Sequence, residues 1–160
     1  MNSEQIQLVQ SSFALVRPLS ADVGEMFYKR LFILDPSLRP MFKGDLAHQS
    51  RMLMVMLDSA VKSLDDLDAL VPVARQLGAR HVRYGVRKQH YDTVGSALLW
   101  TLEKGLAEKF TPAVSEAWAT TYELLASVMQ LGAIEAQPAQ PAHAADSSGS
   151  APSLQEQHET

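Results

Sequence analysis

Residues 77–91 read LGARHVRYGVRKQHY and contain two of the five histidines in the chain, His81 and His90. The two histidines are nine positions apart, so on one helix, at about 100° per residue, they would lie on opposite faces. Two ligands of one ion on a helix stand three or four positions apart, and Gly85 between the histidines favours a helix end. The spacing therefore indicates that His81 and His90 do not share a metal ion.

Each histidine then has its own interpretation. His81 extends an apolar stripe, with Leu77 one turn earlier on the same face. It is either a buried histidine satisfied by a backbone carbonyl, or a single axial ligand to an iron whose other ligands come from a porphyrin. His90 follows the polar residues RKQ and precedes Tyr91, which predicts an exposed side chain at a helix start.

Residues 1–134 have a helical pattern throughout. Apolar residues recur at threes and fours, strand-like alternation is absent, and no Asn-Gly or Gly-Gly turn occurs. The pairs Arg17-Pro18 and Asp35-Pro36 each end a stripe, and DPSLRPMF (35–42) is too rich in proline for a long helix. Thr111-Pro112 is a typical helix start. The pattern predicts an all-α domain, residues 1–134, of six long helices plus a short one.

The C-terminal segment, residues 135–160, has a different composition. From Gln137 it reads QPAQPAHAADSSGSAPSLQEQHET, with Leu154 as its only large apolar residue. Such a segment buries too little surface to offset the entropy lost on ordering, so we predict a disordered tail. His143 and His158 lie there without partners and are not expected to bind metal.

The composition restricts the possible functions. The 160 residues are 46% hydrophobic, enough for the core of one domain, and carry a formal net charge of −4, which does not favour nucleic acid as a partner. No apolar run approaches the roughly eighteen residues of a membrane span, and the N-terminus does not resemble a secretory signal. There is no cysteine, which excludes disulfides, cysteine metal sites and covalent haem attachment. We expect a cytoplasmic protein.

Six stretches of the chain occur in the order and with the spacing of a known family. Over residues 3 to about 131 the sequence resembles bacterial single-domain globins, close to the globin part of flavohaemoglobins and to Vitreoscilla-type haemoglobins. The resemblance implies a globin fold around a haem pocket. The matching stretches are FYKRLF (27–32), PSLRPMF (36–42), HQSRMLM (48–54), LGARHVRYGV (77–86), HYDTVGSALL (90–99) and AWATTYELLA (117–126).

This resemblance implies a role for particular residues. His81 corresponds to the proximal ligand of the iron of a non-covalent haem b, and Phe42 to the phenylalanine that stacks on the haem. Tyr28 and Gln49 correspond to the distal polar pair; from pattern alone they would be an interfacial tyrosine and an exposed glutamine. The other expected haem contacts are Leu53, Val86, Tyr91, Val94 and Arg80, the last either a propionate partner or plain surface charge.

The implied function is reversible binding of O2, and of CO and NO, at a five-coordinate haem iron. Hydrogen-bond donors at Tyr28 and Gln49 should slow O2 release, which suits oxygen storage or transport. Nitric oxide detoxification by a dioxygenase that uses an external reductase is an alternative, and a gas sensor or partner-binding haem protein is another. A monomer or a homodimer fits any of these functions.

Two departures from the flavohaemoglobin pattern affect these expectations. Ala133 stands where the family has a glutamate behind the proximal histidine, and Glu135 is offset from that place by two positions, roughly 200° around a helix. We therefore expect His81 to donate to a main-chain carbonyl such as that of Leu77. No flavin or nicotinamide domain follows in this sequence, so redox cycling should need an external electron donor.

Overall fold

The structure is a computed structural model that describes residues 1–83 and 85–136. Within these residues the regular structure is entirely helical, which confirms the predicted all-α fold. Of the predicted tail, residues 135–160, the first two residues belong to the last helix, and residues 137–160 lie outside the described residues. The α-helices are α1 (Ser3–Val16), α2 (Ser20–Leu34), α3 (Leu46–Lys62), α4 (Leu67–Arg83), α5 (Lys88–Leu106) and α6 (Pro112–Ala136). Short 3-10 helices are η1 (Arg17–Leu19), η2 (Pro36–Met41) and η3 (Ala107–Lys109).

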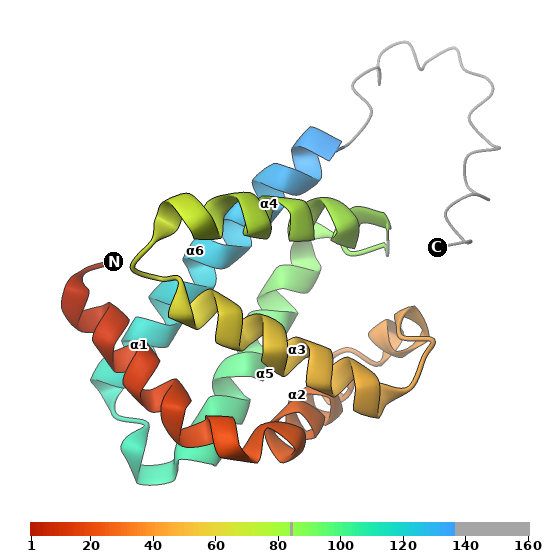
Figure 1. Cartoon of the computed structure of the whole chain (residues 1–160). Helices are drawn as coiled ribbons and strands as arrows, with labels where there is room; N and C mark the ends of the chain where they lie inside the picture. The colour runs from red at the N-terminus through yellow and green to blue at the C-terminus, as the bar shows by residue number, and fades with distance from the viewer. Residues whose placement is uncertain (84, 137–160) are drawn as a thin grey trace, which may run out of the picture.

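The helices cross one another in two layers around a shared core. In Figure 1, α1, α3 and α4 lie in front of α5 and α6. The most extensive packing joins α4 to α6, followed by α2 to α5 and α2 to α3. Buried apolar residues from the predicted stripes fill the space between the layers, with Phe13, Leu31 and Trp118 among the largest fully buried side chains. Removal of this apolar surface from water is the main stabilising contribution.

The helix boundaries follow the local signals in the sequence. The Asp35 carboxylate accepts a hydrogen bond from the backbone N–H of Ser37 at 3.1 Å, where α2 gives way to η2. The Thr111 hydroxyl accepts the N–H of Val114 at 3.2 Å at the start of α6. Gly85 has φ +87° after the end of α4, a backbone conformation that glycine adopts without steric cost. These predicted starts and stops are confirmed.

His90 corrects one expectation from the sequence. It lies at the third position of α5, as a helix-start residue should, but its side chain is buried rather than exposed. Its Nδ1 accepts the backbone N–H of Arg87 at 2.8 Å. The first amides of a helix have no partner within the helix, so the ring folds back over the helix start to satisfy one of them. The expectation of an exposed His90 was therefore wrong.

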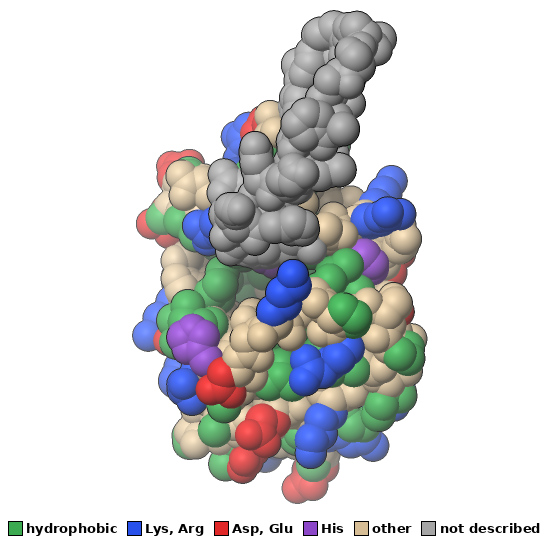
Figure 2. Space-filling view, turned by 90° about the vertical axis from the view of Figure 1, so that its right-hand side faces the viewer, with side chains coloured by type: hydrophobic (Ala, Val, Ile, Leu, Met, Phe, Trp, Pro, Cys, Tyr) green, Lys and Arg blue, Asp and Glu red, His purple; other side chains and the backbone are tan. Residues whose placement is uncertain are grey.

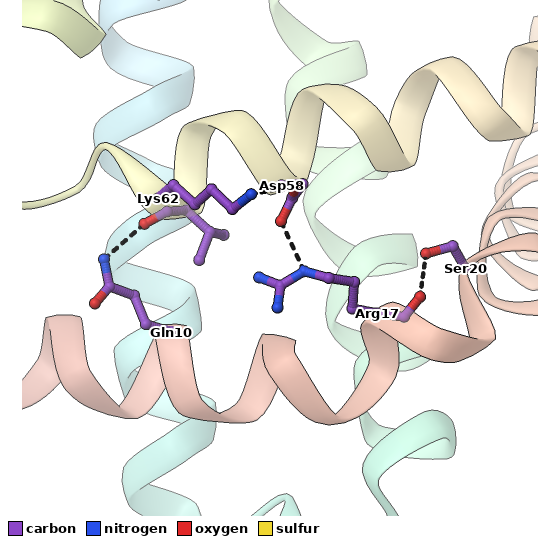
Figure 3. A network of polar contacts seen from close by, with 6 residues as sticks. Gln10, Arg17, Ser20, Asp58 and Lys62 are labelled. Atoms are coloured by element: carbon purple, nitrogen blue, oxygen red, sulfur yellow. Dashed lines mark hydrogen bonds and ion pairs between the residues drawn. The ribbon is translucent and has the colours of Figure 1, made fainter.

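Polar contacts hold the C-terminal half of α3 against α1 and η1 (Figure 3). Arg17 Nε donates to Asp58 Oδ1 at 2.8 Å, and Asp58 also pairs with Lys62 at 3.1 Å. The Gln10 side-chain amide donates to the carbonyl of Val61 at 2.9 Å. Exposed ion pairs contribute little to stability individually, but these contacts fix one end of α3. Its other end carries Gln49, one of the predicted site residues.

Candidate functional site

The structure brings together an aromatic cluster from two of the predicted segments. Tyr28 of α2 is only 5% exposed, and its ring makes edge-to-face contacts with Phe27 and Phe42, with centroids 4.9 and 5.2 Å apart. Phe42 follows directly after η2 and also contacts Phe32 at 5.5 Å. The proline-rich η2 is thus the turn that returns Phe42 to α2. The alternative of Tyr28 as a surface tyrosine with a hydrated hydroxyl does not hold, because the residue is buried.

Gln49 meets the Tyr28 hydroxyl at the edge of this cluster. Burial raises the pKa of Tyr28, and a hydrogen bond with the Gln49 side chain acts in the opposite direction. The two residues meet because α2 and α3 cross closely at Gly24, where an added Cβ would lie 2.9 Å from both Cβ and O of Ser50. The Ser50 side chain is fully buried, and its hydroxyl has no hydrogen-bond partner among the described residues. Leu53, one turn after Gln49, is half-buried against the core.

His81 occupies the last turn of α4 and is half-buried. Its Nδ1 donates to the carbonyl of Leu77 at 2.8 Å, as expected from the sequence. Burial lowers the pKa of His81 below its ordinary 6.5; the Leu77 carbonyl opposes this shift, and the nearby charge of Arg80 adds to it. A neutral imidazole with its proton on Nδ1 keeps the lone pair on Nε2, the form that binds a metal.

The chain after His81 turns back toward the C-terminal end of α4. The N–H of Val86 donates to the His81 carbonyl at 3.2 Å, so the turn at Gly85 closes on the end of α4. Val86 and Val94 are both half-buried, Val94 against the core cluster, while Arg80 is exposed. The turn therefore places Val86 next to the end of α4, and a cation, Arg80, lies at the surface one residue before His81.

Tyr91 lies in the first turn of α5 and is buried. Its backbone is held by Tyr122, a residue that was not predicted from the sequence to belong to the site. The hydroxyl of Tyr122 in α6 donates to the Tyr91 carbonyl at 2.6 Å. Burial raises the pKa of both tyrosines. Gly95 makes the contact possible, because an added Cβ there would lie 2.8 Å from the Tyr122 ring. The sequence signal for this contact was the glycine inside the helical pattern, one turn after Tyr91.

The carboxylate near the end of α6 has its own partner in α4. Glu135 forms an ion pair with Arg75 of α4, and both side chains are largely exposed. Ala133, at the place of the family's glutamate, has no polar side chain. The structure thus gives His81 a neutral acceptor, the Leu77 carbonyl, and gives Glu135 a cation, Arg75.

The site suits a haem better than a bare metal ion. Across residues 1–83 and 85–136 no three His, Asp or Glu side chains form a group able to hold an ion. A porphyrin supplies four ligands itself, so one imidazole is enough. Figure 2 shows hydrophobic side chains between Lys and Arg on one face of the molecule. The macrocycle is apolar on its faces and anionic at its propionates, so the half-buried Phe42, Leu53 and Val94 and the exposed Arg80 are side chains of the kinds that it requires.

The fold and the site together define a class of protein. A sequence profile of the Globin family matches residues 25–129, well over half of the chain. The chain belongs to the globin family, and membership of this family implies haem binding. In the part of the chain that the structure describes, no helix is long and apolar enough to cross a membrane.

Individual relatives within the family are distant. Neuroglobin of Danio rerio is 31% identical over 140 residues, covering 78% of this chain and 87% of that protein. A flavohemoprotein of Vibrio cholerae is 29% identical over 131 residues, 80% of this chain but only 33% of the relative.

Two solved structures share the fold, each at 24% sequence identity and over 84% of this chain. A bacterial globin from Campylobacter jejuni superposes with a TM-score of 0.73 over 97% of its length. An engineered carbene transferase derived from a putative nitric oxide dioxygenase of Rhodothermus marinus superposes with a TM-score of 0.77 over 94% of its length. The globin fold predicted from the sequence is thereby confirmed.

Proposed function

We propose that this globin binds O2 reversibly at the iron of a non-covalent haem b, with His81 as the proximal ligand and Tyr28 and Gln49 on the distal side. The observation that carries the proposal is the buried tyrosine Tyr28, which is 5% exposed and packed against Phe27 and Phe42, with Gln49 at its hydroxyl. Buried polar side chains are costly unless they have partners or a function. A diatomic ligand that accepts hydrogen bonds would give this pair a function.

The residues of the chain determine which ligand is favoured. When bound, haem supplies a ferrous iron that binds diatomic gases and shifts more electron density onto O2 than onto CO. The Tyr28 O–H and the Gln49 amide N–H are then donors to an acceptor with partial negative charge. In a site from which Phe42 and Leu53 exclude water, each hydrogen bond contributes on the order of 1 kcal/mol. Tight, slowly reversible O2 binding follows.

The proximal side supports binding rather than a strongly activated enzyme. His81 donates to the neutral carbonyl of Leu77 at 2.8 Å, and Glu135 is paired with Arg75. A neutral acceptor makes the imidazole a weaker electron donor than a carboxylate would. In this proposal the exposed Arg80 pairs with a propionate, and the half-buried Val86 and Val94 provide apolar contact to the haem.

Nitric oxide dioxygenation with an external reductase is a second candidate. It is favoured by the similarity to a flavohemoprotein over the globin part, and the Tyr28–Gln49 pair is compatible with it. The number of NO molecules that each protein molecule converts to nitrate distinguishes O2 binding from NO dioxygenation. With NO and O2 in excess and an added flavin reductase with NADH, nitrate formation that continues for many turnovers supports the enzyme. A single oxidation that leaves the protein ferric excludes it.

Absorption spectra test the central proposal. Purified protein loaded with haem should show a Soret band that shifts between the ferric, ferrous and CO-bound forms. His81→Ala should lose haem or change its axial ligation. The control is His48→Ala, which removes an exposed histidine from α3. A wild-type protein without a Soret band, or unaltered ligation in His81→Ala, would contradict the assignment.

A further inference from the structure

The crossing of α4 and α6 rests on two glycines that face each other's backbone. A Cβ added to Gly78 of α4 would lie 1.8 Å from the carbonyl oxygen of Met129 in α6. A Cβ added to Gly132 of α6 would lie 2.0 Å from the carbonyl oxygen of Arg75 in α4. Each glycine therefore lies directly on a carbonyl of the other helix. Only residues without a Cβ allow the two helices to approach this closely.

This crossing is linked to His81 through one peptide group. The Leu77 carbonyl that accepts from His81 Nδ1 at 2.8 Å belongs to the peptide bond that joins Leu77 to Gly78. The hydrogen bond fixes the imidazole ring relative to α4, and the glycine contact fixes α4 relative to α6. The hydrogen bond and the glycine contacts both involve backbone atoms, whose positions are less variable than those of long side chains. The position of the ring is thus determined by the backbone of α6.

We propose that Gly78 and Gly132 are positioning residues that set the depth of α4, and with it the reach of the His81 ring toward the haem iron. This inference rests on the proposed role of His81 as the proximal ligand. The Arg75–Glu135 ion pair spans the same crossing at its exposed edge. Glu135 therefore contributes to holding α4 on α6.

The geometry predicts a specific displacement. To bring a Cβ at position 78 from 1.8 Å to an ordinary van der Waals distance, α4 has to move away from α6 by roughly 2 Å. His81 and the Leu77 carbonyl both belong to α4, so the intrahelical hydrogen bond moves with the helix. The ring then changes its position relative to the rest of the site. The bond between iron and imidazole is the quantity that should respond.

The test is the iron–histidine stretching band in the resonance Raman spectrum of the ferrous, ligand-free, haem-loaded protein. We expect Gly78→Ala and Gly132→Ala to shift or split this band. Gly24→Ala is the matched control for crowding, because its added Cβ would lie 2.9 Å from Ser50 at the α2–α3 crossing. Gly105→Ala is the control for the helical substitution itself, since its nearest contact is 3.5 Å. Gly105→Ala should leave the band unchanged, and Gly24→Ala, which crowds the distal side of the site, should move it less than the two α4–α6 variants do.

Three results would overturn the inference. The first is a band identical to that of the wild type in both α4–α6 variants. The second is an equal shift of the band in Gly24→Ala. The third is that both α4–α6 variants fail to fold while Gly24→Ala folds. The last result would show that the crossing supports the fold as a whole and has no separate effect on the histidine. A wild-type protein that takes up no haem contradicts the proposed function instead, so the two failures are distinguishable.

Discussion

Tyr28→Phe isolates one hydroxyl group at the distal side of the site. The tyrosine is 5% exposed, and its ring is held between Phe27 and Phe42. Phenylalanine keeps these ring contacts and creates no large cavity. Only the O–H and its hydrogen bond with Gln49 are lost. Because the half-buried Gln49 amide can turn toward water, the free energy of unfolding should change by less than about 1 kcal/mol.

The effect on ligand binding should be larger than the effect on stability. A hydrogen bond from the Tyr28 hydroxyl to a polar ligand in a buried site is worth about 1 to 1.4 kcal/mol. That energy corresponds to a factor of roughly 5–10 in a rate or equilibrium constant. The O2 dissociation rate constant of Tyr28→Phe should therefore rise by about 5–10-fold. CO accepts hydrogen bonds weakly, so its dissociation should change by less than about twofold.

The assay is O2 release from the ferrous protein, measured by stopped flow with CO as the competing ligand. Tyr122→Phe is the matched control, because it also removes a phenolic hydroxyl, one that donates to the Tyr91 carbonyl in the α5–α6 contact. Gln49→Leu and the double variant with Tyr28→Phe complete a cycle, and the two effects should be non-additive because the side chains interact. Unchanged or slower O2 release in Tyr28→Phe, or an equal effect on CO, would refute the assignment of a distal donor.

Three further predictions concern the haem-free protein and are measured by denaturant unfolding. Ser12→Ala should cost about 1–3 kcal/mol, because the Trp118 indole N–H donates to Ser12 Oγ at 2.8 Å and would be left buried without an acceptor; Ser11→Ala, an exposed neighbour, is its control. Thr111→Ala should cost about 1 kcal/mol through loss of the helix cap on α6. Burial lowers the pKa of His81 below 6.5, so as the pH falls the unfolded chain takes up the proton first, and the free energy of unfolding should decrease below about pH 6.5. His81→Phe should reduce this decrease, and a decrease of the same size in that variant would exclude His81 as its source.

The helices and their ends were predictable because they depend on residues within one turn of each other. Proline cannot continue the hydrogen-bond ladder of a helix, and threonine before proline satisfies a free amide. The stops at Asp35-Pro36 and Gly85 and the start at Thr111 are local consequences of this kind. The choice of His81 over His90 also followed from spacing and from the family pattern around it. The helix ends required no contact between residues far apart in the chain.

Contacts between helices were decided only by the tertiary structure. His90 was expected to be exposed because its neighbours are polar, but packing at the start of α5 buries it. Whether Glu135 meets a histidine or Arg75 depends on how α6 crosses α4. That crossing depends in turn on Gly78 and Gly132, fifty-four positions apart, each lying on a carbonyl of the other helix. The amino-acid sequence by itself determined the helices and predicted His81 as the iron ligand, whereas helix packing decided what surrounds that residue, because steric contact acts between surfaces that are distant in sequence.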